Sequence, residues 1–133
     1  MARYIFPKTV NNEENSTINQ ILKLVEQYFR SHTTSFNAVK IVKNQLTPFQ
    51  FAVLEKVAAL PFGTFQTYGE TAGNLGNSNK ARAVGNALGA NPLPLIIPCH
   101  RILSKNGIGG YSSGRAIKQW LLRFEGIPGK YLF

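Results

Sequence analysis

The chain has 133 residues, of which 44% are hydrophobic, and its 15 Lys and Arg against 6 Asp and Glu give a formal net charge of +9. This length fits one domain with at most a small additional lobe, and the hydrophobic content excludes a disordered protein. The sequence has neither an apolar run long enough to span a bilayer nor a signal peptide, so we expect an intracellular, cytoplasmic protein.

The positive charge favours a polyanionic partner, with nucleic acid as the first candidate and an anionic membrane surface as the alternative. Cys99 is the only cysteine. No internal disulfide can form, which agrees with a reducing compartment. Even with the two histidines, His32 and His100, a cysteine-based zinc site lacks ligands, so we expect no metal site.

Residues 1–45 predict a small N-terminal lobe of strand, helix and strand. The helix is expected to begin at the capping residues Asn15 and Ser16. Its apolar side chains recur at helical spacing and comprise Ile18, Ile21, Leu22, Val25 and Phe29. The β-branched run 39–42 predicts the second strand. Nothing in this segment indicates catalysis.

The part of the chain from residue 46 to 133 is predicted to form the main domain. Thr47-Pro48 is an N-cap followed by proline at the first helical position, and a helix of about a dozen residues is expected up to the turn at 61–63. The stretch 67–70 has the spacing of a capping box and starts a second, shorter helix, which the Gly and Asn residues of 73–77 end.

A third helix is predicted from Asn79 to Leu88, capped by Ser78. Two short helices joined by a tight Gly/Asn turn are the pattern of a helix-turn-helix. In the second of them, Lys80, Arg82 and Asn86 are the residues able to make polar contacts to DNA. Small residues make up most of the remainder, which favours a helix pressed against a groove and reading its shape. The alternative is a tightly packed helix pair without a ligand.

The C-terminal part is predicted to contain a hairpin and a last helix. Asn106-Gly107 between short apolar runs is a hairpin signal. The helix is expected over 116–124, with Ile117, Trp120, Leu121 and Phe124 on one apolar face. The tail 127–133 is either held by its aromatic residues or frayed. The fold class is therefore α+β, with a mostly helical, winged-helix-like domain after the small lobe.

Cys99 lies in the tetrapeptide Pro98-Cys99-His100-Arg101. A thiol is nucleophilic as the thiolate, and a neighbouring base or cation lowers its pKa. The alternative is an inert cysteine buried at the end of a core strand. Adjacent side chains of an extended backbone point to opposite faces, so His100 is expected to reach Cys99 through a water or a bend at Pro98.

A histidine that acts as a base needs a partner that fixes its tautomer, commonly a carboxylate. The chain contains no Asp and six Glu. Glu125 follows the last helix beside its apolar face and is the best candidate for a buried carboxylate.

Several blocks between about residues 47 and 126 occur in an order and spacing typical of one family. The blocks are Thr47-Pro48-Phe49-Gln50, Thr67-Tyr68-Gly69-Glu70, Ala81-Arg82-Ala83-Val84-Gly85, Asn91-Pro92-Leu93-Pro94, Pro98-Cys99-His100-Arg101, Gly109-Gly110-Tyr111-Ser112, and Trp120-Leu121-Leu122 with Glu125-Gly126. They resemble the O6-alkylguanine-DNA alkyltransferases, also called methylated-DNA–protein-cysteine methyltransferases. Full-length relatives carry a larger N-terminal domain, so the lobe of residues 1–45 is expected to be reduced.

The resemblance implies an irreversible, single-turnover transfer of an alkyl group from O6 of guanine, and from O4 of thymine, to the sulfur of Cys99 without a cofactor. It implies that His100 takes the thiol proton through a water and that Glu125 orients His100. Tyr68 resembles the phenol that helps to extrude the nucleotide and gives a proton to the leaving guanine.

The resemblance also implies the partner, which is double-stranded DNA containing O6-alkylguanine, bound by a monomer through the minor groove. Arg82 resembles the arginine that fills the space of the flipped base. Further DNA contacts are expected from Lys80, Asn86, Ala81, Thr67 and Arg101. The substrate pocket is expected to be formed by Asn91, Pro94, Tyr111 and Ser112, and Asn91 resembles the residue that holds the turn before the active-site strand.

Three other functions remain possible. A non-catalytic lesion-binding protein similar to the alkyltransferase-like proteins would keep the DNA-binding frame and replace the cysteine, and the presence of Cys99 argues against it. A winged-helix DNA or RNA module would leave Cys99 inert. A cysteine hydrolase would need an oxyanion hole, for which the sequence has no signal.

Overall fold

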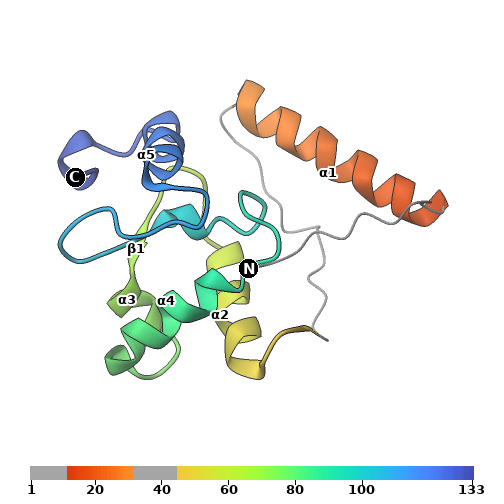
Figure 1. Ribbon diagram of the computed structural model, residues 1–133. Helices are drawn as coiled ribbons and strands as arrows, with labels where there is room; N and C mark the ends of the chain where they lie inside the picture. Colours follow the sequence, from red (N-terminus) through yellow and green to blue (C-terminus); the bar gives the residue numbers. More distant parts are fainter. Residues whose placement is uncertain (1–11, 32–44) are drawn as a thin grey trace.

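The computed structural model describes residues 12–31 and 45–133 (Figure 1). The elements follow in the order α1 (Asn12–Ser31), α2 (Pro48–Ala58), β1 (Gln66–Thr67), α3 (Tyr68–Asn74), η2 (Ser78–Lys80), α4 (Ala81–Gly89), η3 (Cys99–Arg101), β2 (Ile102–Leu103), α5 (Arg115–Phe124) and η4 (Gly129–Tyr131), where η marks a turn of 3₁₀ helix. The described part of the chain is therefore a helix-rich fold with one small sheet.

Helix α1 confirms the predicted N-terminal helix, although it begins at Asn12 and not at the predicted cap. Asn occupies positions 11, 12 and 15 and is frequent at helix starts, so residue type alone does not choose among them. In Figure 1 the orange, C-terminal end of α1 is the end that lies towards α5. The two predicted strands of this segment lie outside the described residues.

The two predicted capping boxes are both present. Thr47 Oγ1 accepts from the backbone N of Gln50 at 3.1 Å, and the Gln50 side chain accepts from Thr47 N at 3.0 Å. Thr67 and Glu70 repeat this arrangement at 3.1 and 2.7 Å. Each box satisfies two backbone donors that the helix itself leaves free, which explains why α2 and α3 begin where the sequence predicts.

The connection between α3 and α4 differs from the prediction. Residues Ser78–Lys80 form the 3₁₀ turn η2, and the α-helix proper is Ala81–Gly89. Asn77, with extended backbone, caps this turn by accepting from Asn79 N at 3.0 Å. Since Asn77 and Ser78 are both good caps, the sequence does not decide which one acts. The predicted pair of short helices joined by a tight turn is confirmed.

The small sheet contradicts the predicted hairpin. Strands β1 and β2 pair in parallel, with Gln66 opposite Ile102 and Thr67 opposite Leu103. The turn at Asn106-Gly107 keeps a single antiparallel bridge, between Ser104 and Gly107. Ile108 N donates to Phe133 O at 2.8 Å, so the chain end takes the place of a second hairpin strand.

Within residues 12–31 and 45–133 the core forms three clusters. The largest joins α2, α3 and α4 and comprises Val53, Leu54, Val57, Ala72, Val84, Ala87, Ile97 and Ile102. A second lies under the tail, where Leu132 is buried, and a third surrounds Tyr28 of α1. The apolar face predicted for α5 is wrong in part, because Ile117 and Trp120 are about half exposed while Leu121 and Leu122 are buried. In the described residues no helix is long and apolar enough to cross a membrane.

Candidate active site

Cys99 begins the 3₁₀ turn η3, directly after Pro98. The backbone bends here, which is one of the two arrangements that the sequence left open. Pro98 O accepts from Arg101 N at 2.9 Å, and Cys99 N donates to Ile97 O at 2.7 Å, which closes the chain into a turn. His100 therefore follows Cys99 around a turn, and both side chains are buried.

A cavity of about 150 Å³ opens onto Cys99. Its lining comes from α3, α4, η3 and the loop before α5 and comprises Tyr68, Gly85, Leu88, Gly89, Cys99, Gly110, Tyr111 and Ser112. Three of the predicted site residues, Tyr68, Tyr111 and Ser112, thus lie around the sulfur. Because Gly85 and Gly89 carry no side chain, α4 does not fill its side of the cavity.

Tyr68 is packed closely against the loop before α5. Gly109 has φ of +78°, and a Cβ there would lie 2.9 Å from the Tyr68 hydroxyl and 3.2 Å from Ser104 N. Both the left-handed backbone and this close approach require glycine. Burial raises the pKa of the Tyr68 phenol against the opposing effect of a backbone hydrogen bond from Gly110, so the phenol is protonated and can donate.

Asn91 and Pro94 were predicted as pocket residues, but neither is among the residues that line the cavity. Asn91 is buried and lies in the turn before Cys99, the place that the resemblance gives it. Its Nδ2 donates to Ile97 O at 2.9 Å, and its Oδ1 accepts from Leu93 N at 2.9 Å. Pro94 bridges to Ile97 within the same turn.

Glu125 is a buried carboxylate surrounded by donors. His100 Nε2 lies 2.5 Å and the Tyr28 hydroxyl 2.7 Å from its Oε2, while Arg101 Nε and Gly63 N donate to its Oε1 at 2.7 and 3.0 Å. Burial by itself would raise the pKa of Glu125, but the hydrogen bonds from His100 and Arg101 outweigh it and hold the pKa at about 2. The predicted His100–Glu125 pair is therefore present, with the carboxylate ionised.

His100 is fully buried. Desolvation lowers its pKa more than the nearby Glu125 raises it, so the ring is neutral. Because Glu125 is ionised, the ring proton lies on Nε2, which donates to the carboxylate. Nδ1 is then an acceptor, and it is buried without a hydrogen-bond partner in the described residues. The ring can take up a proton at this atom.

The Cys99 thiol is protonated in this environment. Burial raises its pKa, although a hydrogen bond from Asn91 and the positive charge of Lys118 act in the opposite direction. Lys118 is itself fully buried, and its Nζ donates to Ile102 O at 2.6 Å and to Gly110 O at 3.0 Å. Burial lowers the pKa of Lys118 to about 8.

The residues predicted to contact DNA differ in accessibility. Four of them lie on η2 and α4, whereas Thr67 and Arg101 make contacts within the protein. Lys80, Arg82 and Asn86 are exposed, and Ala81 is half-buried, on η2 and α4. The Thr67 side chain is occupied by capping α3.

Arg101 corrects the prediction of a DNA contact. It is 3% exposed, and its guanidinium donates to Glu125 and, at 2.6 Å, to Leu60 O. The buried charge of Glu125 requires a cationic partner, and Arg101 is that partner. Its side chain therefore faces the interior and not the surface.

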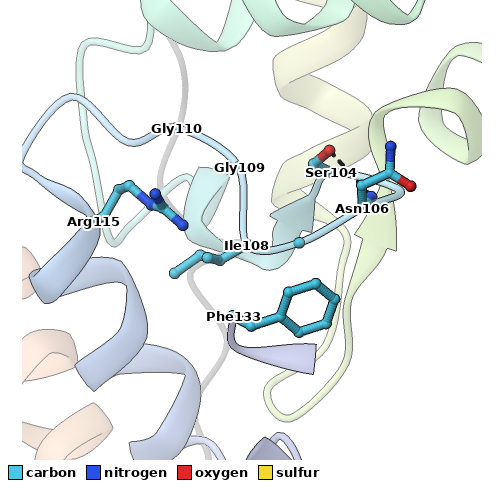
Figure 2. A pocket seen from close by; sticks show the side chains of 8 residues that line it. Ser104, Asn106, Ile108, Gly109, Gly110, Arg115 and Phe133 are labelled. Carbon is cyan, nitrogen blue, oxygen red and sulfur yellow. Dashed lines mark hydrogen bonds between the residues drawn. The ribbon is translucent and has the colours of Figure 1, made fainter. Parts of the chain in front are cut away.

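A second, more open hollow of about 420 Å³ lies behind the loop before α5. Figure 2 shows its lining residues, with Arg115 extending from α5 towards Ile108 and with Phe133 below the loop. Gly110 lines both this hollow and the cavity at Cys99. The loop therefore lies between the hollow and the cavity.

Sequence reasoning missed two buried polar residues, Tyr28 and Lys118. A signal for Lys118 exists, because positions 118, 121, 122 and 125 share one face of a helix and three of them were expected to be buried or apolar. No local signal identifies Tyr28, whose partner lies 97 residues away. The described residues contain no cluster of three or more His, Cys, Asp or Glu side chains that could hold a metal ion.

Residues 48–127 match the family model described as "6-O-methylguanine DNA methyltransferase, DNA binding domain". A relative from Acanthamoeba polyphaga mimivirus, named a probable methylated-DNA–protein-cysteine methyltransferase, is 37% identical over 116 residues, which are 87% of this chain and 77% of the relative.

Two solved structures in complex with DNA are similar to this fold. The Mycobacterium tuberculosis OGT complex is 34% identical with a TM-score of 0.73, over 80% of this chain and 64% of the OGT chain. S. pombe Atl1, bound to DNA containing O6-carboxymethylguanine, is 27% identical with a TM-score of 0.54, over 64% of this chain and 94% of Atl1.

Proposed function

Because the chain belongs to the 6-O-methylguanine DNA methyltransferase family, we propose that it repairs DNA by moving an alkyl group from O6-alkylguanine to Cys99. The product, a thioether, is stable, so each molecule reacts once. The observation that carries this proposal is the juxtaposition of the Cys99 thiol, at a cavity of about 150 Å³, with the buried His100–Glu125 pair. O4-alkylthymine presents a similar alkyl ether and is proposed as a second substrate.

The transfer begins with removal of the thiol proton. The raised pKa of Cys99 means that a base is needed, and Nδ1 of His100 takes the proton through one water. The imidazolium that forms is stabilised by Glu125, whose low pKa keeps it ionised throughout. This arrangement uses the two ring nitrogens of His100 for different tasks.

The thiolate then attacks the alkyl carbon, forming the S–C bond while the C–O6 bond breaks and its electron pair goes to guanine. Tyr68, protonated and on the wall of the same cavity, donates a proton to the leaving base. The Tyr68 phenolate then takes a proton from solvent. The His100 imidazolium releases to solvent the proton that it took from the thiol. Guanine leaves as the normal base, and no cofactor is required.

Access to the sulfur requires that the nucleotide leave the duplex, since Cys99 is buried. Unstacking costs a few kcal/mol, which an inserted side chain can offset. Exposed Arg82 on α4 is proposed to fill the vacated space from the minor groove, with Lys80 and Asn86 beside it. The net charge of +9 supplies phosphate attraction without sequence preference, and the protein is proposed to act as a monomer.

Intact mass after incubation with duplex DNA containing O6-methylguanine tests the proposal. We expect a gain of one methyl group, with the modified peptide containing Cys99. Cys99→Ala should bind the same DNA and gain nothing. An unchanged wild-type mass together with tight lesion binding would instead support the second candidate, a non-catalytic lesion binder. This candidate is kept because Atl1, to which the chain is similar, is bound to DNA containing O6-carboxymethylguanine.

A further inference from the structure

Tyr28 brings helix α1 into contact with the His100–Glu125 pair, here called the relay. It lies outside the region 48–127 that matches the family model, yet its hydroxyl donates to Glu125 Oε2 at 2.7 Å across 97 residues of sequence. The side chain is fully buried. The oxygen that it contacts is the same one that accepts from His100 Nε2.

The ring of Tyr28 is held rigidly by other aromatic residues. Its centroid lies 5.4 Å from those of both Phe62 and Phe124, and 4.9 Å from that of Phe29. Most described side chains of α1 are exposed, and Tyr28 is the one that is fully buried. The aromatic packing therefore fixes the direction in which the hydroxyl points.

The hydroxyl affects both the position and the charge of the carboxylate. A donor to the ionised form stabilises the negative charge and reduces what remains on that oxygen for other partners. Arg101 Nε and Gly63 N donate to Oε1, and Arg101 Nη2 makes a longer contact of 3.2 Å to Oε2. The Tyr28 hydroxyl is the neutral donor that shares Oε2 with His100. Without it, Oε2 would keep only His100 and the longer contact from Arg101, and it would attract the imidazolium form of His100 more strongly.

We propose that Tyr28 is a positioning residue for the transfer, which holds Glu125 Oε2 where it accepts from His100 Nε2 and so leaves Nδ1 as the base. Helix α1 is thereby part of the active centre, through one hydroxyl. The kinetic consequences rest on the proposed alkyl transfer, whereas the effect on the His100 ring does not.

Several charged or titratable groups face His100 besides Tyr28. Glu125 attracts the imidazolium form, Arg101 and Lys118 disfavour it, the Tyr111 ring lies 6.5 Å away edge-on, and Cys99 is its chain neighbour. Tyr28→Phe keeps every one of these groups and removes only the hydroxyl that donates to Glu125. A change in the titration of His100 in that variant therefore reports the lost hydroxyl.

The test compares Tyr28→Phe with Tyr131→Phe. The control removes the same hydroxyl from a partly exposed tyrosine that packs against Phe65 in the tail. Because a hydrogen bond to a charged group is lost, we expect Tyr28→Phe to slow single-turnover transfer about tenfold with DNA affinity unchanged. The acid limb of its rate–pH profile should move to higher pH, since His100 gains affinity for a proton. Tyr131→Phe should leave both unchanged.

Ring ¹⁵N signals of His100 give a readout that does not require transfer. In the wild-type protein the proton should lie on Nε2, and in Tyr28→Phe the His100 pKa should rise. Replacing Tyr28 by 3,5-difluorotyrosine, a stronger donor with a similar ring, should shift the His100 pKa in the opposite direction.

Three results would overturn the inference: wild-type rate and pH profile in Tyr28→Phe, an equal loss in Tyr131→Phe, or a His100 pKa that is the same with either residue at position 28. If Tyr28→Phe does not fold, the His100 pKa of the difluorotyrosine protein tests the inference, and a pKa equal to that of the wild-type protein would overturn it. A wild-type protein that gains no methyl group would contradict the proposed function, while the His100 signals would still show whether Tyr28 acts on the relay.

Discussion

At the scale of single residues, Glu125 determines the chemistry of the site. One carboxylate accepts from a histidine, an arginine, a tyrosine and a backbone amide. These donors keep it ionised at neutral pH, and in the proposed transfer an ionised partner makes His100 a directed base. The raised pKa of Cys99 is therefore compatible with the proposed transfer, in which Nδ1 of His100 takes the thiol proton through a water.

Replacing Glu125 by Gln tests this role. The amide keeps the volume and can still accept from Arg101, so we expect the fold to be retained with reduced stability. It cannot stabilise the imidazolium, so the rate of methyl transfer should fall by about 10²-fold or more, the range of general base catalysis. Stopped-flow or quenched transfer kinetics measure this, with Glu55→Gln on the exposed side of α2 as the matched control. An unaltered rate would remove Glu125 from the relay.

At the scale of elements, α4 and the loop before α5 form opposite walls of the cavity. Helix α4 contributes glycines at 85 and 89, and its Arg82 is exposed. Lys118 ties the loop to the sheet by donating to Ile102 O and Gly110 O. The α4 wall thus carries two glycines beside Leu88, and the loop wall is held by a buried cation.

Arg82→Ala should separate extrusion of the nucleotide from alkyl transfer. If Arg82 stabilises the extruded state of the duplex, the repair rate on duplex DNA should fall at least tenfold, while the rate on free O6-benzylguanine, which needs no extrusion, stays near the wild-type value. Arg123→Ala removes the same charge from the exposed side of α5 and serves as the control. Equal losses on both substrates would contradict the role in extrusion.

At the scale of the whole molecule, the buried network joins parts of the chain that are far apart. Glu125 connects α1, the turn at Gly63 and η3, so that folding and the active site depend on one ionised group. The stability of the protein should therefore depend on the charge of Glu125.

The pH dependence has a definite sign. The pKa of Glu125 is lowered from 4.5 to about 2 on folding. Its contribution to the free energy of unfolding is therefore fully present above about pH 4.5 and is lost as the pH falls towards 2, a loss on the order of 3 kcal/mol at most. Urea unfolding of the wild-type protein between pH 7 and 2.5 should show this decline, and Glu125→Gln should show a smaller one. Parallel curves would contradict it.

The sequence by itself determined what depends on neighbours along the chain. The caps at Thr47 and Thr67, the pair of short helices and the Pro98–Arg101 tetrapeptide are local patterns, because helix starts and turns are decided within a few residues. Glu125 could also be identified, since the chain has few acids and one of them follows an apolar helix.

Only the tertiary structure decided which side chains meet. It pairs β2 with β1 instead of with a hairpin partner, leaves Trp120 half exposed, and turns Arg101 inward to the carboxylate. Tyr28 reaches the same carboxylate from a helix 97 residues away. A buried charge is stable only with hydrogen-bond donors around it, and tertiary packing supplies these donors from distant parts of the chain. No local pattern in the sequence shows which distant residues will meet.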